Sequence, residues 1–342
     1  MTGPRPMMRM IRFVVLTWMA VGLVPGPRPC QAQAVVIGAG YATPGTIDVA
    51  PGQVITIFAR VPGKIPADTV SATPPLPFKL AGVSVVLRQT FPSDPKQIPL
   101  LSVADYQSCS VVAPLVCDTV SMITVQVPFE LTPNVNTVPK TTVPQNFARL
   151  EISYNDAPTN SLFVNPVPDR IHILNSCDVA AAPLRQQETC LPLITRADGT
   201  VVSPDNAPQP GEVLSVSVVG LGPANTPVAT GVAAPQDPVA VDGVLIGLDA
   251  RANASPGMPL AVSSFPANSA LLKSGLVGIY QVTFTVPSLP PGTPACSDMV
   301  RSNLTINIGR TASYDGVGIC VDTSGTPATP SSGRRHVPPA KM

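Results

Sequence analysis

The sequence predicts an all-β protein made of two tandem immunoglobulin-like β-sandwich domains. Residues 123–128 (ITVQVP) recur almost in kind as residues 282–287 (VTFTVP), and the two prolines lie 159 positions apart (287 − 128). The same offset joins residues 51–55 (PGQVI) to residues 210–214 (PGEVL). Because two unrelated segments share one offset, we interpret the chain as two copies of one folding unit.

Strands are expected where apolar and polar residues alternate. In residues 123–127 and 282–286 the apolar residues alternate with threonine or glutamine. In residues 214–218 the apolar residues alternate with serine. A period of two places one face of a strand on a core and the other in water. Further strands are expected at residues 82–87, 150–154, 243–248 and 304–308, with offsets between the copies (161 and 154) close to 159.

Proline and glycine predict the turns between these strands. The chain has 43 prolines in 342 residues, and a proline inside a helix costs about 3 kcal/mol, so long helices are not expected. A Pro-Gly pair supplies a fixed φ followed by a residue that accepts positive φ, which a type II turn requires. Short strands separated in this way favour a sandwich or barrel. Such pairs stand at residues 44–45, 51–52, 62–63, 210–211, 256–257 and 291–292.

The first residues have the pattern of a secretory signal peptide. Arg5, Arg9 and Arg12 precede an apolar run at residues 13–23, and residues 32–34 (AQA) offer a small-residue cleavage site. The run is about half of the roughly 20 residues that a spanning helix needs, so a membrane anchor is disfavoured. We therefore expect an exported protein, extracellular or periplasmic, with no membrane span in the mature chain.

The domain boundaries follow from the repeat and from composition. Residues 323–342 are of low complexity, and we expect them to be disordered. The predicted parts are a signal peptide (1–34), a first β-sandwich (35–168), a disulfide-bearing connection (169–203), a second β-sandwich (204–322) and the tail (323–342).

Six of the seven cysteines remain after Cys30 leaves with the signal peptide. Six cysteines allow fifteen pairings, and sequence alone does not choose among them. No Cys-x-x-Cys or Cys/His cluster favours a metal site, so disulfides are the preferred reading, each adding about 2.5–3.5 kcal/mol in the chain-entropy model. Their clustering favours the pairs Cys109–Cys117, Cys177–Cys190 and Cys296–Cys320.

Charge restricts the partner class. The mature chain keeps 17 of 21 basic residues against 20 acidic ones, because four arginines lie in the signal peptide. A net charge of −3 argues against nucleic acid and against an anionic membrane surface. The partner is therefore expected to be a protein or a glycan.

Catalytic signatures are missing from the sequence. No phosphate loop, dinucleotide fingerprint, His-Glu-x-x-His or Gly-x-Ser-x-Gly elbow is present, so no cofactor and no enzymatic activity are expected. His172, outside the tail the only histidine, lies in an alternating stretch and reads as a packed or surface residue rather than a general base. Asp237, Asp242 and Asp249 could donate oxygens to calcium, but their spacing fits no known loop, and no metal is expected.

Tyrosines are the candidate platforms for sugar binding, because the only tryptophan, Trp18, lies in the signal peptide. The candidates are Tyr41, Tyr106, Tyr154, Tyr280 and Tyr314. Tyr280 and Tyr154 lie on predicted strands and are expected to pack in a core or interface. Tyr106, in a loop-like stretch near Cys109, is the best candidate for an exposed ligand-binding ring.

Six segments in order carry a family resemblance. Together they resemble the uncharacterised C-terminal domain family of secreted acidobacterial proteins (the Solibacter-type domain), over roughly residues 35–308. The resemblance implies an immunoglobulin-like, secreted or cell-surface module and no catalytic residues. The six cysteines depart from it. The segments are 50–58 (APGQVITIF), 75–85 (PLPFKLAGVSV), 123–131 (ITVQVPFEL), 210–222 (PGEVLSVSVVGLG), 231–235 (GVAAP) and 275–287 (GLVGIYQVTFTVP).

The function expected from the sequence is a non-catalytic interaction or structural module. Recognition would use exposed loops or strand addition at an open sheet edge. The alternative is a carbohydrate-binding module that uses exposed tyrosines. A secreted hydrolase dependent on His172 is a third and weaker hypothesis.

Overall fold

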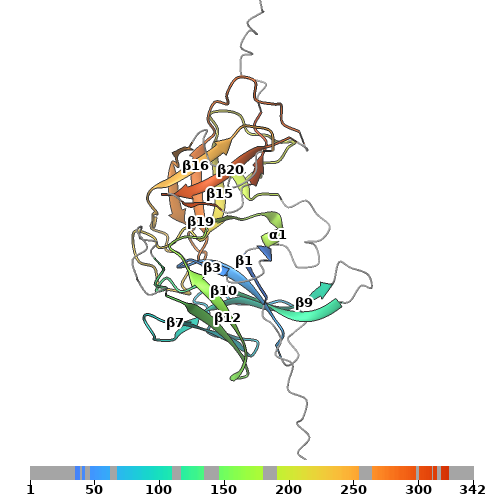
Figure 1. Ribbon diagram of the computed structural model, residues 1–342. Helices are drawn as coiled ribbons and strands as arrows, with labels where there is room; N and C mark the ends of the chain where they lie inside the picture. The colour runs from blue at the N-terminus through green and yellow to red at the C-terminus, as the bar shows by residue number, and fades with distance from the viewer. Residues whose placement is uncertain are drawn as a thin grey trace, which may run out of the picture. The chain divides into compact units, whose positions relative to one another are not determined.

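The computed structural model describes residues 35–38, 41–42, 47–61, 68–109, 117–134, 146–179, 191–253, 264–297, 300–309, 311–313 and 317–322. Within these ranges the protein is all-β, as the sequence predicts, apart from the four-residue helix α1 (Ser176–Val179) (Figure 1). None of its described helices is long and apolar enough to cross a membrane. The predicted signal peptide and tail lie outside the described residues.

Two sheets enclose the first core. Its buried residues come from both sheets and include Ile55, Ile123, Val85 and Leu150. The strands are antiparallel except for the parallel pair β3–β12. One sheet has the order β2 (Tyr41–Ala42), β1 (Val35–Gly38), β4 (Val54–Ala59), β10 (Cys117–Gln126), β9 (Leu100–Cys109), β5 (Val70–Ser71). The other has the order β3 (Ile47–Val49), β12 (Ala157–Pro166), β11 (Ala148–Tyr154), β7 (Val83–Gln89), β6 (Lys79–Leu80), and β8 (Lys96–Ile98) also pairs with β7.

Two further sheets enclose a second, separate core. Val216, Ile246, Val282 and Ile306 are among its fully buried residues. One sheet has the order β13 (His172–Ile173), β15 (Val213–Val219), β19 (Tyr280–Thr285), β18 (Ser269–Leu272), and β14 (Ile194–Arg196) pairs with β15. The other has the order β17 (Ser264–Pro266), β16 (Val244–Asp249), β20 (Ser302–Ile308), β21 (Thr311–Ala312), and β22 (Val317–Ile319) pairs with β20.

Strand pairing repeats between the two sandwiches. In β4 and β10, Ile55 faces Val125 across the ladder, and in β15 and β19, Leu214 faces Phe284. Each residue of the second pair lies 159 positions after its counterpart, and all four are buried. The offset read from the sequence therefore relates equivalent positions in equivalent strands.

The second sheet of each sandwich shows the same correspondence. Leu87 of β7 pairs with Leu150 of β11, and Leu248 of β16 pairs with Leu304 of β20. Successive residues of β7, and of β11 up to Ser153, alternate between buried and more exposed positions, as the period of two predicts. The sandwiches therefore share four central strands, and we attribute the changed offset to different loop lengths.

The glycines of the described Pro-Gly turns have the positive φ that the sequence predicts. Gly52, Gly211 and Gly292 have φ of 73°, 92° and 81°, which is the left-handed region that glycine enters without steric cost. The other three Pro-Gly pairs lie outside the described residues.

The predicted connection contributes strands of its own. β13 and β14 lie within residues 169–203, and both pair with β15. Ile173 and Ile194, one from each strand, are fully buried in the second core. This part of the connection is thus built into the second sandwich.

Candidate functional site

His172 is a packed residue. It lies on β13 with a fully buried side chain, and its Nε2 lies 2.8 Å from Oδ2 of Asp178. The same oxygen accepts a hydrogen bond from the backbone N–H of Asn175 at 2.8 Å. The carboxylate joins β13 to the turn of α1. This arrangement fits a structural role for the histidine.

The three aspartates considered for calcium do not form a cation site. Asp249 is buried, and its carboxylate accepts a hydrogen bond from Nε of Arg251 at 2.9 Å. Asp237 and Asp242 are exposed. In the part of the chain that the structure describes, no three histidine, cysteine or acidic side chains gather where they could hold a metal ion.

Two of the tyrosines are used for packing, as expected. Tyr280 is fully buried, its hydroxyl donates to the carbonyl of Gly222 at 2.5 Å, and burial raises the pKa of its phenol. Tyr154 is half-buried against the first core. Tyr106 lies on β9, not in a loop, with its backbone opposite Val120, and its side chain lies outside the description.

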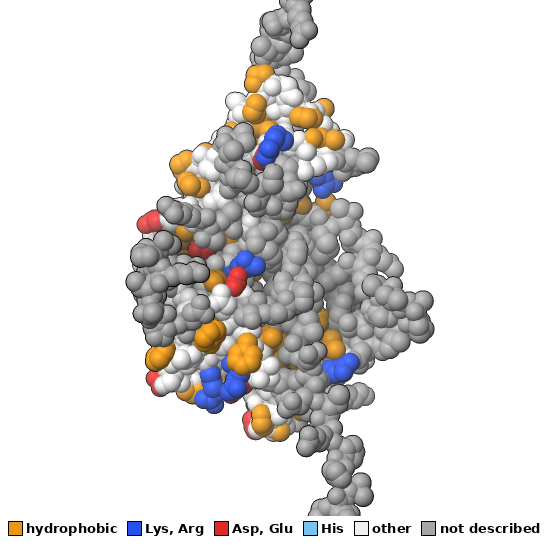
Figure 2. Space-filling model, viewed as in Figure 1, with side chains coloured by type: hydrophobic (Ala, Val, Ile, Leu, Met, Phe, Trp, Pro, Cys, Tyr) orange, Lys and Arg blue, Asp and Glu red, His pale blue; other side chains and the backbone are white. Residues whose placement is uncertain are grey.

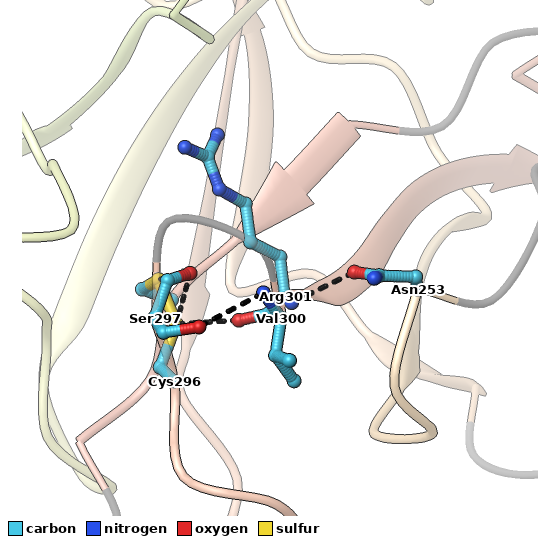
Figure 3. Close-up of a disulfide and its surroundings, with 6 residues drawn as sticks. Asn253, Cys296, Ser297, Val300 and Arg301 are labelled. Carbon is cyan, nitrogen blue, oxygen red and sulfur yellow. Dashed lines mark hydrogen bonds between the residues drawn. A yellow bond between two sulfur atoms is a disulfide. The ribbon is translucent and has the colours of Figure 1, made fainter.

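One predicted disulfide is present. Cys296 and Cys320 are bonded, with their Cα atoms 5.3 Å apart (Figure 3). The bond closes a loop whose ends are 24 positions apart and ties β22 to the segment before β20. This agrees with the neighbour pairing inferred from the sequence.

The structure does not describe the cysteine side chains of the other two predicted disulfides. The backbone register of β9 and β10 places Cys109 directly opposite Cys117. Cys177 lies on α1, and Cys190 lies outside the described residues. Both pairings stay predictions.

The candidate site was missed by the sequence analysis. It lies on the outward face of the sheet β3-β12-β11-β7-β6, and we call it the Phe–Arg face: Phe147, Phe163, Arg88, Arg149 and Glu151. Phe147 and Phe163 are 61% and 62% exposed, although large apolar side chains usually lie inside. In Figure 2, hydrophobic side chains stand beside a group of Lys and Arg side chains on the surface in view.

Register brings the members of the face together. On one row across three strands, Phe163 of β12 faces Arg149 of β11, and Arg149 faces Arg88 of β7. Their neighbours Leu150 and Val164 are buried, so the row points away from the core. Residues opposite one another in a sheet have Cβ atoms about 5 Å apart, which makes the row one continuous surface.

A carboxylate holds the two arginines in place. Glu151 Oε2 accepts a hydrogen bond from Arg88 Nε at 2.7 Å, and its Oε1 accepts one from Arg149 Nη2. The side chains of Arg88 and Arg149 are 48% and 43% exposed, that of Glu151 is 25% exposed. The hydrogen bond from Arg88, together with that from Arg149, lowers the pKa of the Glu151 carboxyl against the opposing effect of desolvation.

Arg88, Arg149 and Glu151 together have one positive charge in excess, and the described residues use only part of their N–H donors. A guanidinium has five N–H groups, and the two bonds to Glu151 take one from each arginine. The remaining donors stand on an exposed surface in a fixed orientation. They can bind a carboxylate in the forked geometry that arginine prefers.

Buried amides hold the corner that carries Phe147. The backbone carbonyl of Phe147 accepts from Thr90 N at 2.9 Å. Beside it, the Asn146 side chain accepts from Phe91 N at 3.0 Å and donates to the carbonyl of Thr132 at 3.0 Å. Asn146 is 6% exposed, so its bonds are shielded from water. Phe147 therefore projects from a fixed backbone.

The second sandwich lacks this face. In the second sandwich the pair equivalent to Arg149 and Arg88 is Asn303 and Asp249. The residue equivalent to Glu151 is Thr305. All three replacements are buried, at 7%, 6% and 1% exposure. The fold thus forms without the exposed charges of the Phe–Arg face, which argues that the face has another purpose.

Comparison of the chain with models of known protein families gives no match, and comparison with curated proteins gives no relative. The family resemblance of the six sequence segments therefore stays a prediction. The functional proposal rests on the geometry of the Phe–Arg face.

Proposed function

We propose that this protein is an exported, non-catalytic interaction module that binds a partner protein through the Phe–Arg face. The observation that carries the proposal is the pair of phenylalanines, each more than 60% exposed, beside two arginines fixed by one glutamate. Burying a phenylalanine side chain yields about 1.5–3 kcal/mol, which folding leaves unused here. Aromatic residues and arginine are also the types enriched at the centres of protein interfaces.

The chemistry of the face specifies the partner. The phenylalanines require an apolar patch, and the surplus positive charge with its free donors requires carboxylates at the margin of that patch. A protein surface with an apolar centre bordered by aspartate or glutamate meets both requirements. Charge complementarity of this kind gives specificity and speeds association.

The short edge strands of the sheets favour recognition through a sheet face over recognition by strand addition. Strand addition needs an open edge with several unpaired backbone groups. Among the described strands, those that end the four sheets are two to four residues long. Short edge strands are a common protection against unwanted pairing. Strand addition is therefore less well supported than binding through a surface. The Phe–Arg face differs from the exposed loops expected from the sequence, because most of its residues lie on the strands β7, β11 and β12.

Export is supported by two independent observations. The first 34 residues have the composition of a signal peptide, and the Cys296–Cys320 bond suits an oxidising compartment. The carbohydrate-binding alternative now depends on Tyr106, Tyr41 and Tyr314, because Tyr280 is buried and Tyr154 is packed against the core.

In the test, residues 35–342 serve as bait to capture a partner protein. The captured partner is then purified, and its dissociation constant is measured with the wild type and with each variant. Changing Phe163 to Ala should raise the dissociation constant at least about tenfold, since interface anchors cost upwards of 1.4 kcal/mol when truncated. Lys79→Ala is the matched control. It removes an exposed cation that is paired with Asp156 on the same sheet but outside the face. Equal affinity of the Phe163→Ala variant and the wild type would refute the proposal, as would binding only to glycans.

A further inference from the structure

A third exposed phenylalanine stands beside the Phe–Arg face. Phe91 lies in the loop between β7 and β8 and is 57% exposed, close to the values of Phe147 and Phe163. Its backbone is fixed next to Phe147, because Phe91 N donates to Asn146 Oδ1 at 3.0 Å and its carbonyl accepts from Asn146 Nδ2 at 2.5 Å. Three exposed rings on one side of a sandwich form an apolar surface of the kind that marks a contact site.

The loop that carries Phe91 also carries an acidic residue. Residues 91–95 read FPSDP, and Asp94 is exposed. Proline fixes φ, so the two prolines restrict the loop and reduce the conformational entropy that binding would remove. An aromatic ring with a carboxylate three residues later is also the combination that the Phe–Arg face requires of its partner. The chain therefore carries both halves of a complementary pair.

The charges of the face and of this loop balance. Arg88, Arg149 and Glu151 sum to +1, and Asp94 adds −1. Two Phe–Arg faces placed together without the loops would bring like charges into contact, which opposes association. With a loop on each opposing face, the arginines meet a carboxylate, for which a guanidinium is the preferred partner.

The order of these parts along the sheet suits a two-fold symmetric dimer. Phe147 directly precedes β11, two residues from Arg149, and its carbonyl accepts from Thr90 N, next to the 91–95 loop. Phe147 thus lies between the arginine row and the loop. In a symmetric dimer residue i of one copy meets residue j of the other, and j meets i. An axis that crosses the strands at Phe147 places the loop of each copy on the arginine row of the other.

We propose that the Phe–Arg face binds a second copy of this chain, in a two-fold symmetric dimer in which Asp94 of each copy pairs with Arg149 of the other. This inference rests on the proposed function and names its partner. The exposed part of each phenylalanine ring is roughly 100 Å². The six rings of a dimer therefore supply about half of the roughly 1,200 Å² at which specific interfaces begin. The arginine rows and loops supply the rest, and we expect a dimer that dissociates on dilution.

Charge reversal tests the pairing, with residues 35–342 followed by sedimentation equilibrium. Asp94→Lys and Arg149→Glu each place like charges at both contacts, so each should raise the dimer dissociation constant at least about tenfold. An equimolar mixture of the two variants should dimerise again, because both contacts of the mixed dimer then join opposite charges. Asp242→Lys, at an exposed aspartate of the second sandwich, is the matched control and should leave dimerisation unchanged. Asp94→Lys changes an exposed loop residue, so its thermal unfolding should match that of the wild type.

The outcomes separate the dimer from the proposed function. A wild type that stays monomeric at every concentration overturns the dimer, as does a dimer that Asp94→Lys leaves unchanged. If a crosslinking amino acid at position 163 then captures a different protein, the Phe–Arg face still binds a partner, and the proposed function stands. Dimerisation that survives Phe163→Ala unchanged would contradict the dimer interface proposed here, and the absence of any other partner at position 163 would contradict both.

Discussion

Gln53 and Glu212, 159 residues apart, close equivalent turns with the same side-chain bond. Gln53 Oε1 accepts from Ala50 N at 2.9 Å, and Glu212 Oε1 accepts from Gln209 N at 3.1 Å. In both turns the glycine between these residues has positive φ. The repeat therefore extends from strand pairing to individual hydrogen bonds.

The backbone around these residues repeats as well. Val127 N donates to the carbonyl of Gln53 at 2.8 Å, and Val286 N donates to that of Glu212 at 2.8 Å. Such agreement across 159 positions supports the duplication more strongly than the sequence alone, in which the two segments share only part of their residues.

Removing the side-chain bond should destabilise the first sandwich more than the second. Gln53 is 3% exposed, so Gln53→Ala leaves the Ala50 N–H buried without an acceptor, at a cost of about 1–3 kcal/mol. Glu212 is half-buried, so water can replace its bond to Gln209 N, and its ion pair with Arg196 is partly exposed and weakened by solvent; Glu212→Ala should therefore cost less. Urea unfolding of both variants measures the difference; an unchanged midpoint for Gln53→Ala would contradict this account of the turn.

Truncating the exposed aromatic ring should leave folding almost unaffected. Phe163 is 62% exposed, so Phe163→Ala should change the free energy of unfolding by less than about 0.5 kcal/mol. Leu150→Ala, on the buried side of the same sheet, should cost about 2–5 kcal/mol. Thermal unfolding compares the two. A large loss of stability in Phe163→Ala would show that the ring serves the fold and not a partner.

Glu151 should make stability depend on acid pH. Its folded pKa is lowered from the usual 4.5, chiefly by the hydrogen bond from Arg88, while the unfolded chain keeps the usual value. Its contribution is therefore full above pH 4.5 and is lost as the pH falls through the lower folded pKa. In the Glu151→Gln variant, the midpoint of urea unfolding should depend less on pH in this range than it does in the wild type. An identical profile in the variant would mean that the arginines do not hold the carboxylate in solution.

The disulfide should stabilise the second sandwich. In the chain-entropy model, opening the loop between Cys296 and Cys320 costs about 3.5 kcal/mol. The variant in which both residues are alanine should lose stability of this order, measured by urea unfolding under oxidising conditions. Peptide mapping without reductant should recover the same pair, and a different partner for Cys320 would contradict the structure.

Much of the fold follows from short-range pattern. β19 alternates strictly and has one buried face, so period two identifies it. β13 and β14 are two and three residues long, too short for a period to be read, and they flank the two cysteines, Cys177 and Cys190, that suggested a connection. Their strand character comes from pairing with β15, a long-range contact that local pattern does not contain.

The Phe–Arg face was partly within reach of the sequence. Phe147 and Phe163 are out of phase with the buried Leu150 and Val164, so alternation places both rings outward. Tyrosine was the expected ligand platform, whereas the signal of this face lies in the phenylalanines at outward positions beside β11 and on β12. The link between Arg88 and Glu151, 63 residues apart, depends on the register of β7 and β11 and could not be read from one sequence.

Site-specific photo-crosslinking tests the central claim most directly. A crosslinking amino acid at position 163 of the otherwise intact protein should form an adduct with the partner. The same amino acid at position 213, where Val213 is 48% exposed in the second sandwich, should form none. Adducts from position 213 with none from position 163 would contradict binding through the Phe–Arg face.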